Sequence, residues 1–163
     1  MRVGLFDYGV GNLHSLQKAL QSGGASVTIT SDLDDALRMD ALVLPGVGAF
    51  APAATALGPM ASSMRSALGA GFPCLGICLG MQLLFDSSEE GFGIGVGAFR
   101  GHVRRLHARR VPHMGWNEVE VSGEDPPFSG FGTMPAYLAN SFVAEPSNPA
   151  EIVATTEYEG QRF

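Results

Sequence analysis

The first ninety residues alternate short, continuous apolar runs with stretches of helical periodicity, and this alternation limits the fold more than any other feature. We expect strands at 3–6, 27–29, 41–44 and 72–77, and helices after Asn12, after Asp32, over 53–68 and over 79–85. Apolar runs without polar alternation are typical of strands buried on both faces, as in parallel sheets covered by helices. The predicted fold class is therefore α/β, with a central, mainly parallel sheet flanked by helices on both faces.

After Glu90 the pattern changes to short strand-like segments separated by glycine-rich turns. We expect these segments at 103–106, 118–121, 137–139 and 152–156, as antiparallel strands appended to the sheet. No repeat and no linker divides the chain, so residues 1–163 are predicted to form a single domain. Glu159-Gly160 is a turn signal, and a return strand should begin at Gln161. We expect the natural chain to continue, with the C-terminal part of the domain missing here, because so short a strand pairs and buries little.

Composition and charge exclude several classes of protein. The formal net charge of −6 disfavours a nucleic-acid or anionic-membrane partner. No apolar run approaches the ~20 residues of a membrane span, and Asp7 arrives too early for a signal-peptide core. The two cysteines, Cys74 and Cys78, provide neither a disulfide framework nor zinc-ligand spacing. We therefore expect a cytoplasmic protein without a metal or cofactor.

The pentapeptide Gly76-Ile77-Cys78-Leu79-Gly80 stands where a predicted strand passes into a helix. This is the nucleophile-elbow pattern with cysteine in place of serine, and its glycines let strand and helix approach closely around a strained residue. An isolated cysteine is more often a buried core residue. The flanking glycines and the strand-helix junction favour the nucleophile here, whereas Cys74 has no such frame and is predicted to belong to the core.

Acyl transfer also needs donors for an oxyanion. The backbone N–H of Leu79 follows the nucleophile and is one natural donor. A second donor is expected from Pro45-Gly46-Val47-Gly48, at the end of the neighbouring strand. Parallel strands end at one edge of the sheet, so this loop should face the elbow.

Three motifs resemble those of class-I glutamine amidotransferases, and more narrowly those of the glutaminase subunit of imidazole glycerol phosphate synthases, from histidine biosynthesis. They are Pro45–Phe50, Gly76–Gln82 and Val111–Asn117, and the opening Asp7–Asn12 matches as well. The resemblance extends in order from residue 3 to about 158. It implies a flavodoxin-like amidotransferase fold that hydrolyses glutamine to glutamate and ammonia.

The resemblance also implies roles for individual residues. The thiolate of Cys78 would attack the glutamine side-chain amide, with the N–H groups of Val47 and Leu79 as the oxyanion hole. The positions that match substrate-binding residues are Gly46, Gly48, Gln82, Glu90 and Ser141. Plainer interpretations remain open: Gln82 could cap a loop, and Glu90 could be an ordinary solvated charge. Asn140 stands where relatives often carry histidine, just before Ser141.

A partner is implied by the same resemblance. The family docks this subunit, as a heterodimer, on a (β/α)8-barrel cyclase that uses the ammonia to make imidazole glycerol phosphate and AICAR. Positions that match the interface are Asn12, Met114, Trp116 and Tyr137. Because Trp116 is the only tryptophan, packing in the core is the alternative.

One family feature is absent from the sequence. The family supplies its base and orienting residue from a Phe-His-Pro-Glu run, and none of the four histidines here is followed two residues later by glutamate. His113 belongs to the motif on the interface side, so we do not assign it as the base. Either these residues lie in a missing C-terminal segment, or the chain is an inactive partner-binding scaffold. A different cysteine hydrolase built on the same elbow is the third possibility.

Overall fold

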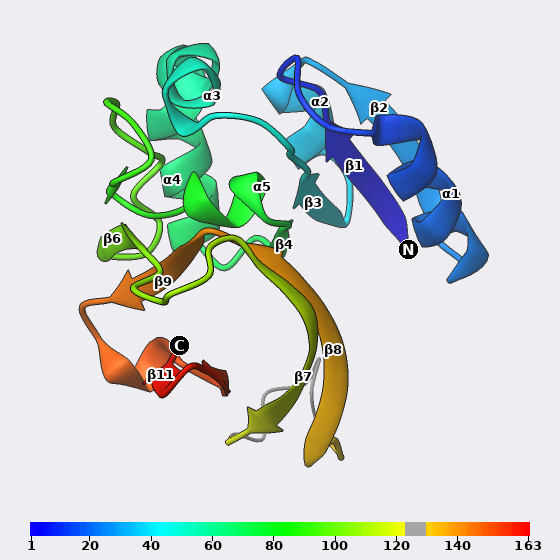
Figure 1. Cartoon of the computed structure of the whole chain (residues 1–163). Helices are drawn as coiled ribbons and strands as arrows, with labels where there is room; N and C mark the ends of the chain where they lie inside the picture. Colours follow the sequence, from blue (N-terminus) through cyan, green and yellow to red (C-terminus); the bar gives the residue numbers. More distant parts are fainter. Residues whose placement is uncertain (123–129) are drawn as a thin grey trace.

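Four parallel strands form the central sheet of the molecule, in the order β2-β1-β3-β4 (Figure 1). The computed structural model describes residues 1–122 and 130–163. The strands span Arg2–Phe6 (β1), Ser26–Thr30 (β2), Ala41–Leu44 (β3) and Cys74–Gly76 (β4). Because all four run parallel, the loops that follow β1, β3 and β4 leave the sheet at the same edge.

Helices cover both faces of this sheet, as the sequence predicts. They span Leu13–Ser22 (α1), Leu33–Leu37 (α2), Phe50–Leu57 (α3), Ala61–Gly69 (α4) and Leu79–Gln82 (α5). Val3, Leu5 and Val43 turn to one face and pack with apolar side chains of α1. The alternate residues of the same strands turn to the other face, where α2 to α5 contribute to a larger buried cluster. The side-chain period of two along a strand produces this division.

The predicted helix starts after Asn12, after Asp32 and at residue 79 hold, whereas the helix predicted from 53 begins at Phe50. Two of the predicted helices are interrupted or shorter than expected. Asn12 and Asp32 cap α1 and α2 by accepting backbone N–H groups, as predicted. The stretch 53–68 is not one helix: a short 3-10 turn, Gly58–Met60, separates α3 from α4, because proline lacks the N–H that a continuous helix requires. Similarly, α5 ends at Gln82. Beyond it, the N–H groups of residues 84 and 85 donate to the carbonyls three residues earlier, which is the tighter 3-10 pattern.

The remaining strands form two further sheets. One has the order β11-β10-β7-β8 and is antiparallel, and the other has the order β5-β6-β9. Their bounds are Ser87–Ser88 (β5), Gly101–Arg105 (β6), His113–Val121 (β7), Thr133–Asn140 (β8), Phe142–Pro146 (β9), Ala154–Tyr158 (β10) and Gln161–Arg162 (β11). The return strand expected at Gln161 is confirmed by its pairing with β10. The pair β7–β8 is much longer than predicted and curves away from the central sheet (Figure 1).

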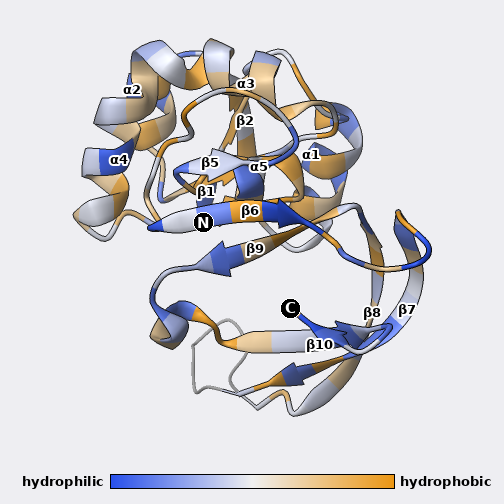
Figure 2. Cartoon of the chain, turned by 60° about the vertical axis from the view of Figure 1, so that its left-hand side comes forward, coloured by the Kyte–Doolittle hydropathy of each residue, from blue (hydrophilic) through white to orange (hydrophobic). Residues whose placement is uncertain are grey.

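Hydrophobic residues are concentrated where the helices pack on β1 to β4, whereas β6 is mostly hydrophilic, with one hydrophobic segment (Figure 2). Val103 is the buried position at the centre of β6. Among the described residues, no helix is both long enough and apolar enough to cross a membrane.

Candidate active site

Cys78 occupies the turn between β4 and α5, with its side chain exposed. Its backbone adopts φ 53° and ψ −110°, in the region of positive φ that a residue with a Cβ rarely enters. Such strain persists only where the surrounding packing fixes it, and it gathers at functional sites. The turn therefore presents one thiol, carried on a strained backbone, at the edge of the sheet where the parallel strands end.

The two glycines of the pentapeptide allow this turn because each lies against backbone atoms. A Cβ on Gly76 would lie 2.7 Å from the Cα of Met81. A Cβ on Gly80 would lie 2.6 Å from the carbonyl carbon of Leu44, and closer still to its oxygen. Strand β3, strand β4 and helix α5 are thus packed backbone to backbone around Cys78, which is the close approach that the motif predicts.

The loop after β3 faces this elbow, as expected. A Cβ on Gly46 would lie 2.9 Å from the Cβ of Leu79 and 3.2 Å from the backbone nitrogen of Gly80. Gly48 has φ 137°, and the Val47 side chain between the two glycines is 65% exposed. The loop 45–48 and the elbow therefore form one continuous surface next to Cys78.

Leu79 is the first residue of α5, and its side chain is buried. The first N–H groups of a helix have no acceptor within the helix, so the Leu79 N–H is free of the helical hydrogen-bond pattern. It follows Cys78 directly, which is the position of an oxyanion donor in a nucleophile elbow. An N–H from the facing loop would complete a pair of donors.

Gln82 and Glu90 are linked through Ser88, which sequence reasoning missed. Gln82 is buried, and its Oε1 accepts a hydrogen bond from Ser88 Oγ at 3.1 Å. Ser88 Oγ in turn accepts from the backbone N–H of Glu90 at 3.1 Å. Gln82 thus fixes the segment that carries Glu90, whichever further role it has. A serine six residues after a helical glutamine gives no signal in the sequence that would reveal this link.

Glu90 is a partly buried carboxyl group at the end of this link. Its Oε2 is buried without a hydrogen-bond partner in the described part of the chain. Burial raises the pKa of Glu90, while the backbone N–H of Phe50 and the side chain of Gln82 lower it in part. A buried carboxylate oxygen without a partner is ready to accept a hydrogen bond from a cation such as an ammonium group.

Ser141 lies in the short connection between β8 and β9, and its carbonyl accepts the N–H of Leu106 at 2.9 Å. Asn140, which precedes it, donates to the carbonyl of Phe142 at 3.3 Å, and its own Oδ1 is buried without a partner among the described residues. The connection at Ser141 is therefore held by hydrogen bonds to the backbone of Leu106 and Phe142.

Cys74 differs from Cys78 in its position, its packing and its exposure. It lies within β4, packs against the larger hydrophobic cluster, and is only partly exposed. Burial raises the pKa of the Cys74 thiol to about 12. Cys74 is therefore a protonated side chain of the core, which confirms its predicted place.

Three predicted interface residues form an exposed apolar face on the β7–β8 ribbon. Met114, Trp116 and Tyr137 are 65%, 72% and 56% exposed. Trp116 and Tyr137 are direct cross-strand partners, and their rings meet edge to face with centroids 5.7 Å apart. Trp116 is thus not a core residue. Asn12 is exposed as well, although its side chain is used to cap α1 by accepting the Ser15 N–H.

His113 is buried at the start of β7 and is already engaged. Its Nε2 lies 2.9 Å from Asn117 Oδ1, and its ring stacks on Tyr158 with centroids 3.9 Å apart. Asn117 also donates to Thr156 Oγ1 and to the carbonyl of Glu157. These contacts tie β7 to β10 and give His113 a structural setting.

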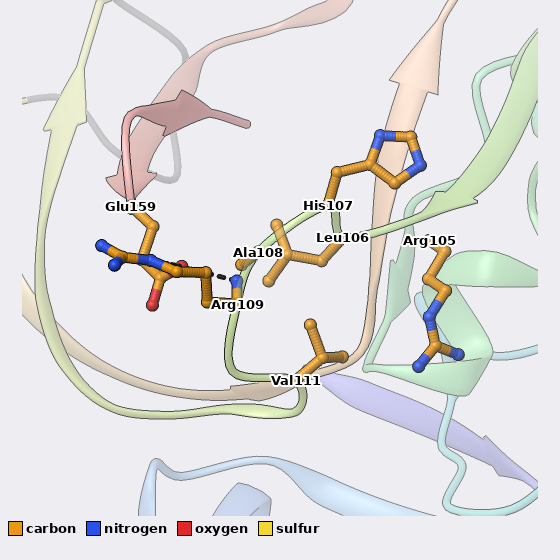
Figure 3. A pocket seen from close by; sticks show the side chains of 7 residues that line it. All are labelled: Arg105, Leu106, His107, Ala108, Arg109, Val111 and Glu159. Carbon is orange, nitrogen blue, oxygen red and sulfur yellow. Dashed lines mark hydrogen bonds and ion pairs between the residues drawn. The ribbon is translucent and has the colours of Figure 1, made fainter.

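A hollow of about 740 Å³ lies elsewhere, between the β6–β7 connection and the β10–β11 turn (Figure 3). Arg105, His107 and Arg109 are its basic lining residues, and Glu159 is its acidic one. Glu159 accepts the backbone N–H of Arg109 at 2.6 Å. The lining residues include neither Cys78 nor the loop 45–48, so Cys78 does not open into this hollow. Over residues 1–122 and 130–163, no group of three or more histidine, cysteine, aspartate or glutamate side chains gathers to hold a metal ion.

Comparison with known proteins identifies the family. The family model described as "Glutamine amidotransferase class-I" matches residues 4–162. A crystal structure of a glutamine amidotransferase shares the fold with a TM-score of 0.72 at 16% identity, covering 98% of this chain and 86% of that one. The strained cysteine, the facing glycine loop and this match agree, and the chain belongs to the class-I glutamine amidotransferases.

More similar relatives give the branch of the family. A protein of Natronomonas pharaonis is 44% identical over 161 residues, which cover 94% of this chain and 75% of the relative. A protein of Halobacterium salinarum is 43% identical over 167 residues, covering 96% and 75%. Both are named imidazole glycerol phosphate synthase subunit HisH, so within the amidotransferases the chain stands in the HisH branch.

Proposed function

We propose that this chain hydrolyses glutamine through a Cys78 thioester and passes the ammonia to a cyclase subunit of imidazole glycerol phosphate synthase, in histidine biosynthesis. The observation that carries the proposal is the exposed Cys78 at φ 53°, facing the glycine loop after β3. Membership of the amidotransferase family and its HisH branch supports the substrate. Residues 1–163 would act as one domain, and the free thiol of Cys78 is suited to a reducing cytoplasm.

The reaction divides into two acyl transfers. The Cys78 thiolate attacks the side-chain amide carbon of glutamine, and the carbonyl oxygen becomes an oxyanion held by the N–H groups of Leu79 and Val47. Collapse of this intermediate breaks the C–N bond, and the leaving nitrogen takes up the proton that the Cys78 thiol gave up, to depart as ammonia. Water then attacks the glutamyl thioester, which releases glutamate and restores the thiol.

The substrate would lie along the elbow and the neighbouring loop. Gly46 lets the loop pack closely on the elbow, and the open surroundings of Gly48 would let the side-chain amide of glutamine approach the loop backbone. The buried, unpartnered Oε2 of Glu90 is suited to the α-ammonium group of glutamine, and Gln82 holds the Glu90 segment in place through Ser88. Ser141 is proposed as a further contact through its short connection.

The partner would cover the exposed apolar face of Met114, Trp116 and Tyr137, and Asn12 is proposed as a further contact. Tryptophan, tyrosine and methionine are enriched in the cores of protein interfaces. A heterodimer that covers the exit of the site would keep ammonia from escaping to water. The general base is assigned to none of the four histidines of this sequence, because the Phe-His-Pro-Glu run is absent.

Labelling by 6-diazo-5-oxo-L-norleucine, a diazoketone analogue of glutamine, tests the nucleophile. The chain, with and without the cyclase subunit, is treated with the reagent and weighed by mass spectrometry. Wild type and Cys74→Ser should each gain one adduct, and Cys78→Ser should gain none. Labelling of Cys74 instead, or no labelling of wild type with the partner present, would contradict the proposal and favour an inactive scaffold. Preferential reaction with other acyl substrates would favour a different cysteine hydrolase.

A further inference from the structure

Tyr8 lies just beyond the end of β1, on the same edge of the sheet as Cys78. It is 8% exposed, and its ring stacks on Phe6 with centroids 6.2 Å apart. A phenol buried to this extent normally directs its hydroxyl to a specific partner. Here the hydroxyl donates a hydrogen bond to the carbonyl oxygen of Pro45, the residue that begins the glycine loop.

The same hydroxyl lies beside the position that a side chain on Gly46 would fill. A Cβ on Gly46 would lie 2.9 Å from the Tyr8 oxygen and 2.9 Å from the Cβ of Leu79. Gly46 is thus enclosed between the phenol on one side and the residue after the nucleophile on the other. Burial, with a smaller contribution from nearby Cys78, raises the pKa of Tyr8, so the hydroxyl remains a donor at any working pH.

We propose that Tyr8 is a positioning residue: its hydroxyl fixes Pro45 and so sets where the oxyanion loop stands relative to Cys78. This inference rests on the proposed glutaminase function. It goes further by naming a residue that touches neither the substrate nor the reacting atoms.

The physical need for such an anchor comes from the loop itself. Gly46 and Gly48 give the loop the freedom to bring its N–H groups to the oxyanion, and the same freedom would let those groups point elsewhere. A hydrogen bond at Pro45 limits this freedom at one end of the loop. The phenol can resist displacement because its ring is held in the core beside Phe6.

The test compares Tyr8→Phe, which removes only the hydroxyl, with Tyr158→Phe as a matched control. Tyr158 also donates its hydroxyl to a backbone carbonyl, that of Arg110, but on β10. Glutamine hydrolysis is measured in the complex with the cyclase subunit. We expect Tyr8→Phe to lower kcat about tenfold and to change KM less than about twofold, since the oxyanion forms only along the reaction. Tyr158→Phe should change neither.

A second pair of measurements does not depend on turnover. Labelling of Cys78 by the diazoketone requires a carbonyl in the oxyanion hole, whereas alkylation by iodoacetamide requires only the thiolate. Tyr8→Phe should slow the first about tenfold and leave the second unchanged. Backbone hydrogen exchange should rise at Val47 and Gly48 alone.

The outcomes separate the two proposals. Equal kcat and equal diazoketone labelling in wild type and Tyr8→Phe would overturn the role of Tyr8 while leaving the glutaminase intact. Exchange that rises over all strands of the sheet would overturn it as well, because Tyr8 would then act only on stability. Failure of wild type itself to release glutamate and to be labelled at Cys78 would instead refute the proposed function.

Discussion

Gly80 lies against the carbonyl group of Leu44, so that the last residue of β3 and the second residue of α5 touch through their backbones. A Cβ at position 80 would lie 2.6 Å from the Leu44 carbonyl carbon. The contact joins the strand that precedes the loop 45–48 to the helix that follows Cys78. The distance between the two halves of the site is therefore set by the absence of a side chain.

Gly80→Ala should separate these halves. The methyl group meets rigid backbone on β3, so we expect a loss of about 1–3 kcal/mol in the free energy of unfolding. We also expect diazoketone labelling of Cys78 to fall at least about tenfold. Gly69→Ala is the control, because nothing lies within 4 Å of its Cβ position near the end of α4. Urea unfolding and labelling rates measure both, and equal behaviour of the two variants would contradict the contact.

The two thiols should react at very different rates in the folded chain. Burial raises the pKa of Cys74 to about 12, so almost no Cys74 thiolate exists at pH 8. We expect one fast equivalent of reaction with iodoacetamide at pH 8, from exposed Cys78, and a second equivalent only after denaturation. Cys78→Ser should remove the fast phase, and Cys74→Ser should keep it. Two fast equivalents in wild type would show that β4 does not protect Cys74.

Glu90 should make the protein less stable as pH rises. Burial raises the folded pKa of Glu90 above the ordinary value of a glutamate, so the folded state holds the proton more tightly than the unfolded state. The free energy of unfolding should therefore fall from about pH 4.5 up to the raised pKa, and remain lower above it. Glu90→Gln should flatten this slope and gain less than about 1 kcal/mol at pH 7, since the carboxyl is only partly buried.

Thermal unfolding between pH 4 and pH 8 measures the effect of Glu90. The exposed Glu151→Gln variant serves as the control for loss of one negative charge. A stability profile of Glu90→Gln that runs parallel to wild type would show that Glu90 is not responsible for the slope.

The exposed apolar face should dominate docking on the cyclase subunit. Trp116→Ala removes a large aromatic side chain that the free chain leaves 72% exposed. We expect a loss of at least about 2 kcal/mol in binding, or roughly 30-fold in Kd, with the free energy of unfolding changed by less than about 0.5 kcal/mol. Titration calorimetry measures the first quantity.

Phe131→Ala is the matched control for that experiment. Phe131 is also an exposed aromatic residue, at 57%, but it precedes β8, six residues before Tyr137. Its loss should leave the Kd within about twofold of wild type. Equal weakening by both substitutions would show that general surface hydrophobicity, rather than the Trp116 face, holds the partner.

The sequence predicted those parts of the molecule whose physics is local. Strand and helix order from β1 to β4 followed from apolar periodicity, and the starts of α1 and α2 followed from Asn12 and Asp32. The elbow around Cys78 was predictable because two glycines, each two residues from a cysteine at a strand-helix junction, allow the close approach of strand and helix that a nucleophile elbow needs. The facing of Gly46 and Leu79 followed from the shared edge of parallel strands.

What could not be predicted depends on contacts between distant residues. The hydrogen bond from Tyr8 to Pro45 spans 37 positions, and neither residue indicates the other. The lengths of β7 and β8 were underestimated because their pairing with each other, as at Trp116 and Tyr137, extends strands beyond their local pattern. The break between α3 and α4 was missed although Pro59 marks it.

The position of Trp116 gives the protein a built-in optical reporter. It is the only tryptophan in the chain, it is largely exposed to water, and its ring meets Tyr137 edge to face. Fluorescence excited at the red edge of the indole absorption band therefore comes from Trp116 alone and reports on its surroundings, without any added label. Indole emission shifts to shorter wavelength when water leaves the ring, so the arrival of a covering surface would be visible in real time in the unmodified chain.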